Sequence, residues 1–368
     1  MSRRPGRGDG LPYRVYERHG TRTYSIGYKL PTGRWAFRLK CPVSDRAKIA
    51  EIRAEAIRRA GEIGLGAPAD GSVDAILTAW VAWQESLPND SPRRRADSTM
   101  KENKREIVRL RKAFGHMMAG DLTKTDAYAY LDACVKASRP EKGNKEISLM
   151  RRILEHAVRL GIIVLNPFDG VEKNETVAYE RLVSDQEIAL AVEVGRMMGG
   201  PNIIVALALK TAWLCLRRSV EVRGMTYDQV TDEGIRWVAA KRRRGATPRV
   251  GIIEWSAELR ATIDEALAIK RYKDADEIYV FGNLKGQRYT KGGWKITLAR
   301  LMTECSRIAA ERGIPFQPFS LQDCRPKGVS DKLDDGAEDV IDATLHTSER
   351  MVRQVYDRRR VRRAKPAR

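Results

Sequence analysis

Residues 319–325 read FSLQDCR and residues 344–351 read TLHTSERM, and Tyr356 follows shortly after them. The first segment ends in Arg325, and the second contains His346. Arginine presents a permanently charged, planar fork that matches phosphate oxygens, and tyrosine is a weak nucleophile until its phenolate is stabilised. Together the three residue types indicate chemistry on a phosphodiester. Taken alone, a tyrosine that follows a histidine at this distance more often belongs to a hydrophobic core.

A second group of charged residues lies well upstream. Residues 216–222 read LRRSVEV, and Lys241 opens a basic run that we expect at the tip of a β-hairpin. The combined set resembles the active site of the tyrosine recombinases, the phage integrase family: Arg218, Lys241, Gln322, Arg325, His346 and Tyr356. That family carries an arginine, a hairpin lysine, His-x-x-Arg, a histidine or tryptophan, and the nucleophilic tyrosine. The resemblance runs from about residue 72 to the end, and depends on the order and spacing of all six positions.

Two of these assignments have close competitors. Arg217 stands beside Arg218, and we choose Arg218 because the family places an acidic residue three positions after its catalytic arginine, where Glu221 fits. An arginine near a glutamate is otherwise often a structural ion pair. At the hairpin, Arg242 or Arg243 could occupy the place of the lysine, since hairpin registers slip easily.

The chain departs from the family pattern around Arg325. Gln322 stands where the family carries the first histidine. A glutamine amide donates a hydrogen bond but cannot shuttle a proton. Pro326 follows directly, removes one backbone donor and disfavours a helical Arg325, so we expect the helix to bend or restart there.

The spacing of His346 and Tyr356 is a further departure. Leu345 takes the place of a glycine, and His346 and Tyr356 are ten residues apart, one more than the family pattern. On one straight helix this separation is about 15 Å, too far for both to reach one phosphate. We therefore expect a turn between them, with Thr347 or Ser348 capping a new helix.

The resemblance implies a site-specific DNA recombinase of a phage, prophage or genomic island, which integrates DNA such as a viral genome. Tyr356 would form a 3′-phosphotyrosine, Arg218 and Arg325 would bind the phosphate oxygens, and Lys241 would protonate the leaving 5′ oxygen. His346 and Gln322 would hydrogen-bond the phosphate. The family needs no ATP, metal or other cofactor. The alternatives are a DNA-binding relative with weakened catalysis and a type IB topoisomerase.

Composition agrees with a nucleic-acid partner. The 368 residues include 68 Lys and Arg against 48 Asp and Glu, a formal charge of +20, which favours a polyanionic ligand over a merely basic surface. Five scattered cysteines form no disulfide or zinc pattern. No apolar run would span a membrane, so we expect a cytoplasmic protein in a bacterial host. The expected partners are double-stranded attachment sites, other copies in a tetramer and, as an optional addition, DNA-bending accessory proteins.

Residues 1–64 are expected to form a small domain of three strands, at 13–17, 23–30 and 34–41, and one helix at 44–63. One face of this sheet would be basic, with Arg22, Lys29, Arg38 and Lys40. It would lie in a DNA groove or face solvent. The domain looks like the arm-type DNA-binding domain of many phage integrases.

Residues 72–170 are expected to form an all-α bundle similar to the core-binding domain of that family. Its helices would include residues 76–87, 99–114, 125–136 and 144–160. The expected DNA contacts there are Arg93, Arg94, Arg95 and Lys104.

Residues 184–368 are expected to form a mainly α catalytic domain with a small β-sheet. Residues 184–187 read as a capping box, residues 203–213 as a buried helix, and residues 229–230, 235–240 and 250–255 as strands. The basic hairpin tip would add three DNA contacts, Arg242, Arg243 and Arg244. The whole chain is then a multidomain α+β protein.

Overall fold

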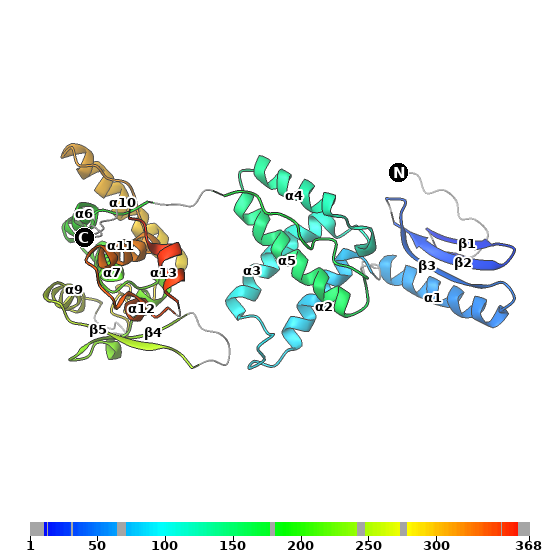
Figure 1. Ribbon diagram of the computed structural model, residues 1–368, viewed down its shortest axis with the longest axis horizontal. Coiled ribbons are helices and arrows are strands. Elements are labelled where there is room, and N and C mark those ends of the chain that lie inside the picture. The colour runs from blue at the N-terminus through cyan, green and yellow to red at the C-terminus, as the bar shows by residue number, and fades with distance from the viewer. Residues whose placement is uncertain are drawn as a thin grey trace, which may run out of the picture. The chain divides into compact units, whose positions relative to one another are not determined.

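The computed structural model describes residues 11–12, 14–30, 32–64, 71–176, 181–240, 247–272, 278–346 and 348–359. The chain divides into two compact units, 1–177 and 178–368, and each is treated by itself (Figure 1). The fold is mixed α+β, with a three-stranded sheet near the N-terminus and a mainly helical second unit, which confirms the predicted class. Among the described residues, no helix combines the length and apolarity that crossing a membrane requires.

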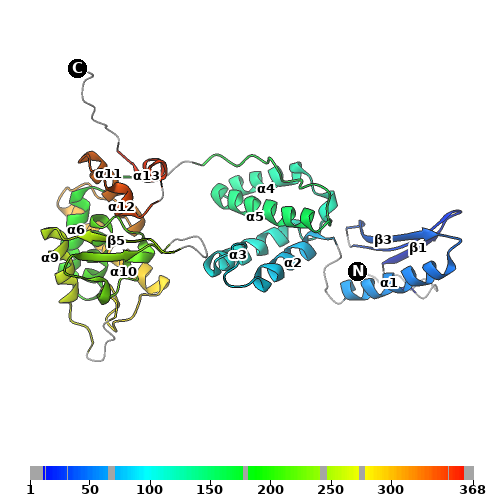
Figure 2. The same cartoon turned by 60° about the horizontal axis from the view of Figure 1, so that its bottom comes forward.

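The first unit begins with an antiparallel sheet of β1 (Val15–His19), β2 (Thr23–Lys29) and β3 (Trp35–Pro42). Helix α1 (Arg46–Gly64) covers one face of this sheet in both ribbon views (Figure 2). Its core includes Tyr24, Ile26 and Ala56, all without exposed surface. The predicted strands and helix are confirmed to within a few residues.

Basic and aromatic side chains meet on the same small sheet. The Lys29 ammonium lies 4.9 Å from the centre of the Trp35 ring, and the Arg38 guanidinium lies 5.2 Å from it. Each is a cation–π contact. This surface is where a groove-binding sheet would carry its cations, and the arm-type role stays a prediction.

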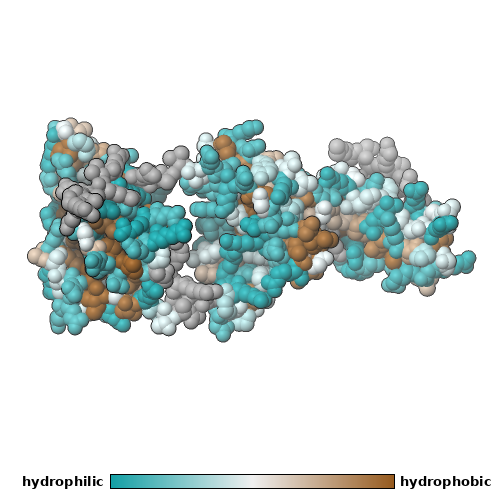
Figure 3. Space-filling model, viewed as in Figure 1, coloured by the Kyte–Doolittle hydropathy of each residue, from teal (hydrophilic) through white to brown (hydrophobic). Residues whose placement is uncertain are grey.

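Four helices follow in the first unit, namely α2 (Val73–Ser86), α3 (Asp97–Phe114), α4 (Lys124–Lys136) and α5 (Pro140–Arg159). They enclose one hydrophobic core, in which Leu77, Leu110 and Met150 are fully buried. Helix α5 begins earlier than the predicted residue 144, because proline is favoured in the first helical turn. Most of the surface seen in Figure 3 is hydrophilic.

The second unit is built around α7 (Pro201–Leu214), which is apolar on nearly all sides and is packed by α6 (Asp185–Met198), α9 (Ala257–Leu267), α10 (Lys291–Glu311) and α11 (Leu321–Asp334). The remaining elements are α8 (Ser219–Val222), the 3₁₀ turn Tyr227–Gln229, β4 (Gly234–Val238), β5 (Val250–Glu254), α12 (Val340–Thr344) and α13 (Glu349–Tyr356). The predicted capping box opens α6, since Ser184 Oγ accepts the Glu187 N–H and Glu187 accepts the Ser184 N–H.

Two local predictions are wrong. Residues 229–230 are not a regular strand: Gln229 closes a 3₁₀ turn by accepting the Thr226 N–H at 3.0 Å, and Val230 makes only an isolated bridge. Helix α11 does not restart at Pro326 but runs through it. The one intrahelical bond that Pro326 cannot make would reach the carbonyl of Gln322, an exposed residue in the first turn of the helix.

Helices α6 and α7 approach closely at Gly195, where a Cβ atom would lie 2.6 Å from the Ala206 Cβ. We expect Gly195→Ala to lower the free energy of unfolding by about 1–2 kcal/mol, because overpacking costs about 1–3 kcal/mol and outweighs the better helix propensity of alanine. Gly292→Ala is the control. That glycine lies in α10 with no atom near the place of a Cβ. Urea denaturation should separate the two variants, and equal midpoints would contradict the close packing.

Candidate active site

Four of the predicted site residues meet in one cluster of the second unit: Arg218, Arg325, His346 and Tyr356. The Arg218 Nη2 lies 2.7 Å from the His346 Nε2. The Arg325 guanidinium lies over the Tyr356 ring, 4.9 Å from its centre. The rings of His346 and Tyr356 meet edge to face at 5.3 Å. Residues from four separate stretches of the chain therefore surround one small volume.

The backbone reaches Arg218 through Leu216, a residue in the left-handed conformation. Helix α7 ends at Leu214, and Leu216 has a φ of 54°, a conformation that L-residues other than asparagine and aspartate seldom adopt. Its side chain is buried in a small core with Val329 and Val352, and this packing offsets the backbone strain. Arg218 then occupies the N-cap of α8.

Glu221 holds the arginines in place. Its buried carboxylate accepts the Arg218 backbone N–H at 2.9 Å and the Arg218 Nη1 at 3.1 Å, and it lies 3.8 Å from the Arg325 Nη1. It also accepts the Ala240 N–H at 3.1 Å. One carboxylate thus contacts both guanidinium groups and the backbone at Ala240, two residues beyond the end of β4 (Gly234–Val238).

Arg325 has unused hydrogen-bond donors. Its side chain is 3% exposed, and Nη2 donates to the Thr344 carbonyl at 3.0 Å. The Nε and Nη1 atoms make no hydrogen bond with the part of the protein that the structure describes. Burial, and secondarily the charge of Arg218, lowers the pKa of Arg325 to about 10. A buried cation with idle donors is a candidate binding group for an anion.

Arg217, the competitor of Arg218, is enclosed in the core of the same unit. Its side chain is fully buried, and its guanidinium lies 5.3 Å from the centre of the Trp237 ring. Burial lowers its pKa to about 10. Because Arg217 is enclosed in the core, the geometry favours Arg218 as the arginine that faces a ligand.

A turn separates His346 from Tyr356, as the spacing predicted. Helix α12 ends at Thr344, Leu345 is left-handed with a φ of 53°, and α13 begins at Glu349. This conformation explains why the related pattern carries a glycine there. Sequence reasoning missed Arg249, whose Nη1 donates to the His346 carbonyl at 2.5 Å and orients that turn. No local motif marks Arg249.

The other predicted catalytic residues do not join this cluster in the described structure. Gln322 is exposed in the first turn of α11, and its side chain makes no hydrogen bond with a described residue. Lys241, Arg242, Arg243 and Arg244 lie outside the described residues, as does Thr347.

The predicted DNA contacts of the first unit have different environments. Arg93 is exposed, whereas the Arg94 Nη1 donates to the Leu87 carbonyl at 2.6 Å and so caps the end of α2. Arg95 lies over the Trp80 ring at 5.6 Å, and Lys104 forms an exposed ion pair with Glu85. Of these four side chains, only that of Arg93 makes no hydrogen bond, ion pair or cation–π contact with the part of the protein that the structure describes.

A polar hollow of about 630 Å³ lies between α3 and α5. Arg95 and Asn103 reach it from the α3 side, and three further cations line it: Lys145, Arg152 and Lys173. Sequence reasoning missed these three, although Lys145 and Arg152 lie on the same helix α5 and Lys173 follows it. Three carboxylates, Glu102, Glu106 and Glu141, also line the hollow, so its cations exceed its anions by only one.

We expect Glu221→Gln to lower the free energy of unfolding by about 3–5 kcal/mol, because it leaves buried guanidinium groups without their counter-charge. Glu193→Gln is the matched control. Glu193 pairs with Arg312 at 2.8 Å on the surface of the same unit, so its loss should leave the urea midpoint nearly unchanged. Similar small effects of both variants would show that Glu221 does not hold the cluster together.

Comparisons with known proteins were made at the levels of sequence and structure. No protein-family model and no curated protein sequence matches the chain. A lambda integrase tetramer bound to a Holliday junction is similar with a TM-score of 0.64 at 15% identity, over 99% of this chain and 100% of that chain. A lambda integrase dimer bound to a COC′ core site gives 0.63 at 14% identity, over 100% of both chains.

The integrase of transposon Tn1549, in complex with circular intermediate DNA, is a further structural neighbour. Its TM-score is 0.61 at 13% identity, over 77% of this chain and 95% of that chain. At such low identity a structural likeness carries the fold and not the chemistry. The chain has the fold of the tyrosine recombinases.

Proposed function

We propose that this chain is a site-specific DNA recombinase that cuts and rejoins duplex DNA through a 3′-phosphotyrosine at Tyr356. The observation that carries the proposal is the convergence of Arg218, Arg325 and His346 on Tyr356, from separate parts of the chain. Two guanidinium groups beside a tyrosine suit an in-line attack on a phosphodiester.

The arginines supply the electrostatic part of the reaction. The idle Nε and Nη1 donors of Arg325 and the forked donors of Arg218 would bind the non-bridging oxygens of the scissile phosphate. Charge builds on these oxygens in the transition state, where fixed donors are most effective. Glu221 orients the two arginines without cancelling both charges.

Tyr356 would be the nucleophile. Its Oη forms a bond to phosphorus as the bond from phosphorus to the 5′ oxygen breaks. The tyrosine releases its proton to water, and the 5′ oxygen gains one from Lys241. The Arg325 charge, 4.9 Å from the ring centre, stabilises negative charge on the phenol oxygen. Attack by a 5′ hydroxyl of another duplex reverses the step, so no ATP is consumed.

Double-stranded attachment sites are the proposed substrate. The lambda and Tn1549 integrases named above are bound to DNA in their structures, one of them as a tetramer on a Holliday junction. By analogy we propose that four copies of this chain assemble on two sites, with DNA-bending accessory proteins as optional partners. Arg93 and the hollow between α3 and α5 are the proposed contacts of the helical bundle with phosphates.

Gln322 favours one alternative, a DNA-binding relative with weakened catalysis. It stands where a histidine is expected, and its exposed side chain has no contact that fixes it toward the cluster in the described structure. Measuring a covalent protein–DNA adduct separates the two functions. Duplexes selected for binding from a random-sequence pool would be nicked at successive positions, so that the fragment with the 5′ hydroxyl diffuses away after cleavage.

We expect Tyr356→Phe to abolish this adduct while DNA binding and folding persist, because the variant loses only the hydroxyl. Tyr289→Phe is the control. Tyr289 is buried against Trp294, with ring centres 5.5 Å apart, and should be dispensable for the chemistry. The adduct is measured on denaturing gels with labelled DNA. An adduct that persists in Tyr356→Phe would assign the attack to another residue.

Gln322→Ala should slow cleavage by roughly tenfold to a thousandfold, because it removes one donor from the transition state. Gln322→His should retain activity. Single-turnover cleavage at saturating DNA measures both variants. A wild-type rate in the alanine variant would show that Gln322 contributes nothing.

A further inference from the structure

The chain just after Tyr356 is fastened to its own unit by Arg358. The Arg358 Nη1 donates to the Arg181 carbonyl at 2.6 Å, and it lies 3.9 Å from the Asp323 Oδ1. Only 16% of the Arg358 side chain is exposed. An arginine on an open surface would keep its charged end in water, whereas this side chain is packed against the protein and held by these contacts.

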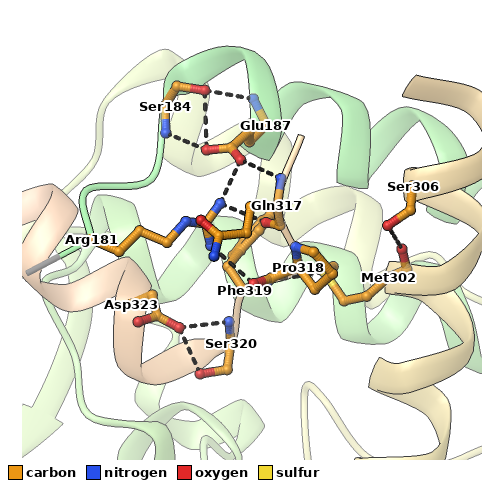
Figure 4. A network of polar contacts seen from close by, with 10 residues as sticks. All are labelled: Arg181, Ser184, Glu187, Met302, Ser306, Gln317, Pro318, Phe319, Ser320 and Asp323. Carbon is orange, nitrogen blue, oxygen red and sulfur yellow. Dashed lines mark hydrogen bonds and ion pairs between the residues drawn. The ribbon is translucent and has the colours of Figure 1, made fainter. Parts of the chain in front are cut away.

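Arg181, at one end of this connection, is itself rigidly held. Its guanidinium pairs with Glu187 and donates to the carbonyls of Gln317 and Pro318, as Figure 4 shows. The Glu187 carboxylate also accepts the Gln317 N–H at 2.9 Å. The Arg181 carbonyl, which accepts the hydrogen bond from Arg358, therefore belongs to a residue whose own side chain is fixed by several contacts.

The other end of the connection is the start of α11. Asp323 accepts the Ser320 N–H and the Ser320 Oγ, both at 2.9 Å, and so caps this helix (Figure 4). Arg325 lies two residues after Asp323 on the same helix. Arg358 thus links the chain at the end of α13 to α11, the helix that carries Arg325.

The middle of α11 supplies a second connection through Ser330, which is 1% exposed. Its Oγ donates to the Tyr356 carbonyl at 3.3 Å and accepts the Arg358 N–H at 3.0 Å. Further along α11, the Leu333 carbonyl accepts from the Arg359 Nη1 at 2.9 Å. The Tyr356 carbonyl and the residues just after it are therefore fixed by α11.

Helix α13 needs such support. It has eight residues, and an isolated helix of that length is unstable in water. Val352 is a buried apolar anchor, 1% exposed. Because a displacement of about 1 Å can cost roughly a hundredfold in rate, the contacts at its C-terminal end would govern how often Tyr356 is correctly placed.

We propose that Arg358 and Ser330 are positioning residues that hold Tyr356 against Arg325. This proposal depends on the proposed function for its catalytic consequence, although the connection itself exists without DNA. Neither side chain needs to touch the phosphate.

The test compares Arg358→Ala, Arg358→Lys and Ser330→Ala with Arg312→Ala. This charge-matched control removes an arginine that pairs with Glu193 at 2.8 Å on the surface of the same unit. Three quantities are measured: affinity for a selected duplex, the cleavage rate at saturating DNA, and amide hydrogen exchange of residues 349–356. We expect Arg358→Ala and Ser330→Ala to slow cleavage by roughly 10- to 100-fold and to speed exchange, with affinity retained. Arg358→Lys should restore most of the rate, because an ammonium still reaches a carbonyl.

Ser330→Ala is the decisive variant, because it changes no charge and therefore cannot act through weaker attraction to DNA. Weakened binding with a wild-type rate at saturation in Arg358→Ala would make Arg358 a phosphate contact and overturn its positioning role. Unchanged rate and exchange in Ser330→Ala would overturn the role of Ser330. If the wild type forms no adduct, the proposed function fails, and the exchange measurement alone then decides whether these residues hold α13.

Discussion

The structure of the candidate site depends on one buried carboxylate, that of Glu221. Placing arginines out of water is costly, and a nearby negative charge is what makes it tolerable. The Glu221 carboxylate accepts hydrogen bonds from the backbone N–H and the guanidinium of Arg218, and it lies 3.8 Å from the Arg325 Nη1. Two cations against one anion leave the cluster positively charged. The site is thus ordered without a ligand and keeps a net positive charge, which is the electrostatic preorganisation that the proposed binding of a phosphate requires.

Helix α11 connects Arg325 to the chain around Tyr356. It carries Arg325, it packs on the central helix α7, and its carbonyls and hydroxyl hold the chain around Tyr356. Gly328 lets it approach α7, since a Cβ there would lie 2.3 Å from the Trp213 carbonyl. A change in α11 would therefore move an arginine and the tyrosine together, whereas a change in α13 would move the tyrosine alone.

Sequence predicted the parts of this structure that local patterns determine. Helix 99–114 followed from its apolar spacing. The choice of Arg218 came from the family pattern, which places an acidic residue three positions later, and Glu221 does cap α8 and pair with Arg218. Pro326 shows the limit of a local rule, since one missing bond in the first turn did not break α11. Arg358 and Arg181 are 177 residues apart, and no local pattern marks a contact of that kind.

With glutamine at position 322, the proposed reaction needs one group to bind the phosphate and a different group to supply the proton. A neutral amide can share in binding the phosphate, but the proton for the leaving oxygen must come from elsewhere. The backbone N–H of Ala240, two residues beyond the end of β4, donates to Glu221, the carboxylate that also orients Arg218. In the proposed reaction, Lys241 supplies the proton, and the arginines that Glu221 orients bind the phosphate. Replacing Gln322 would therefore weaken phosphate binding in the proposed reaction without removing Lys241, the proposed proton donor.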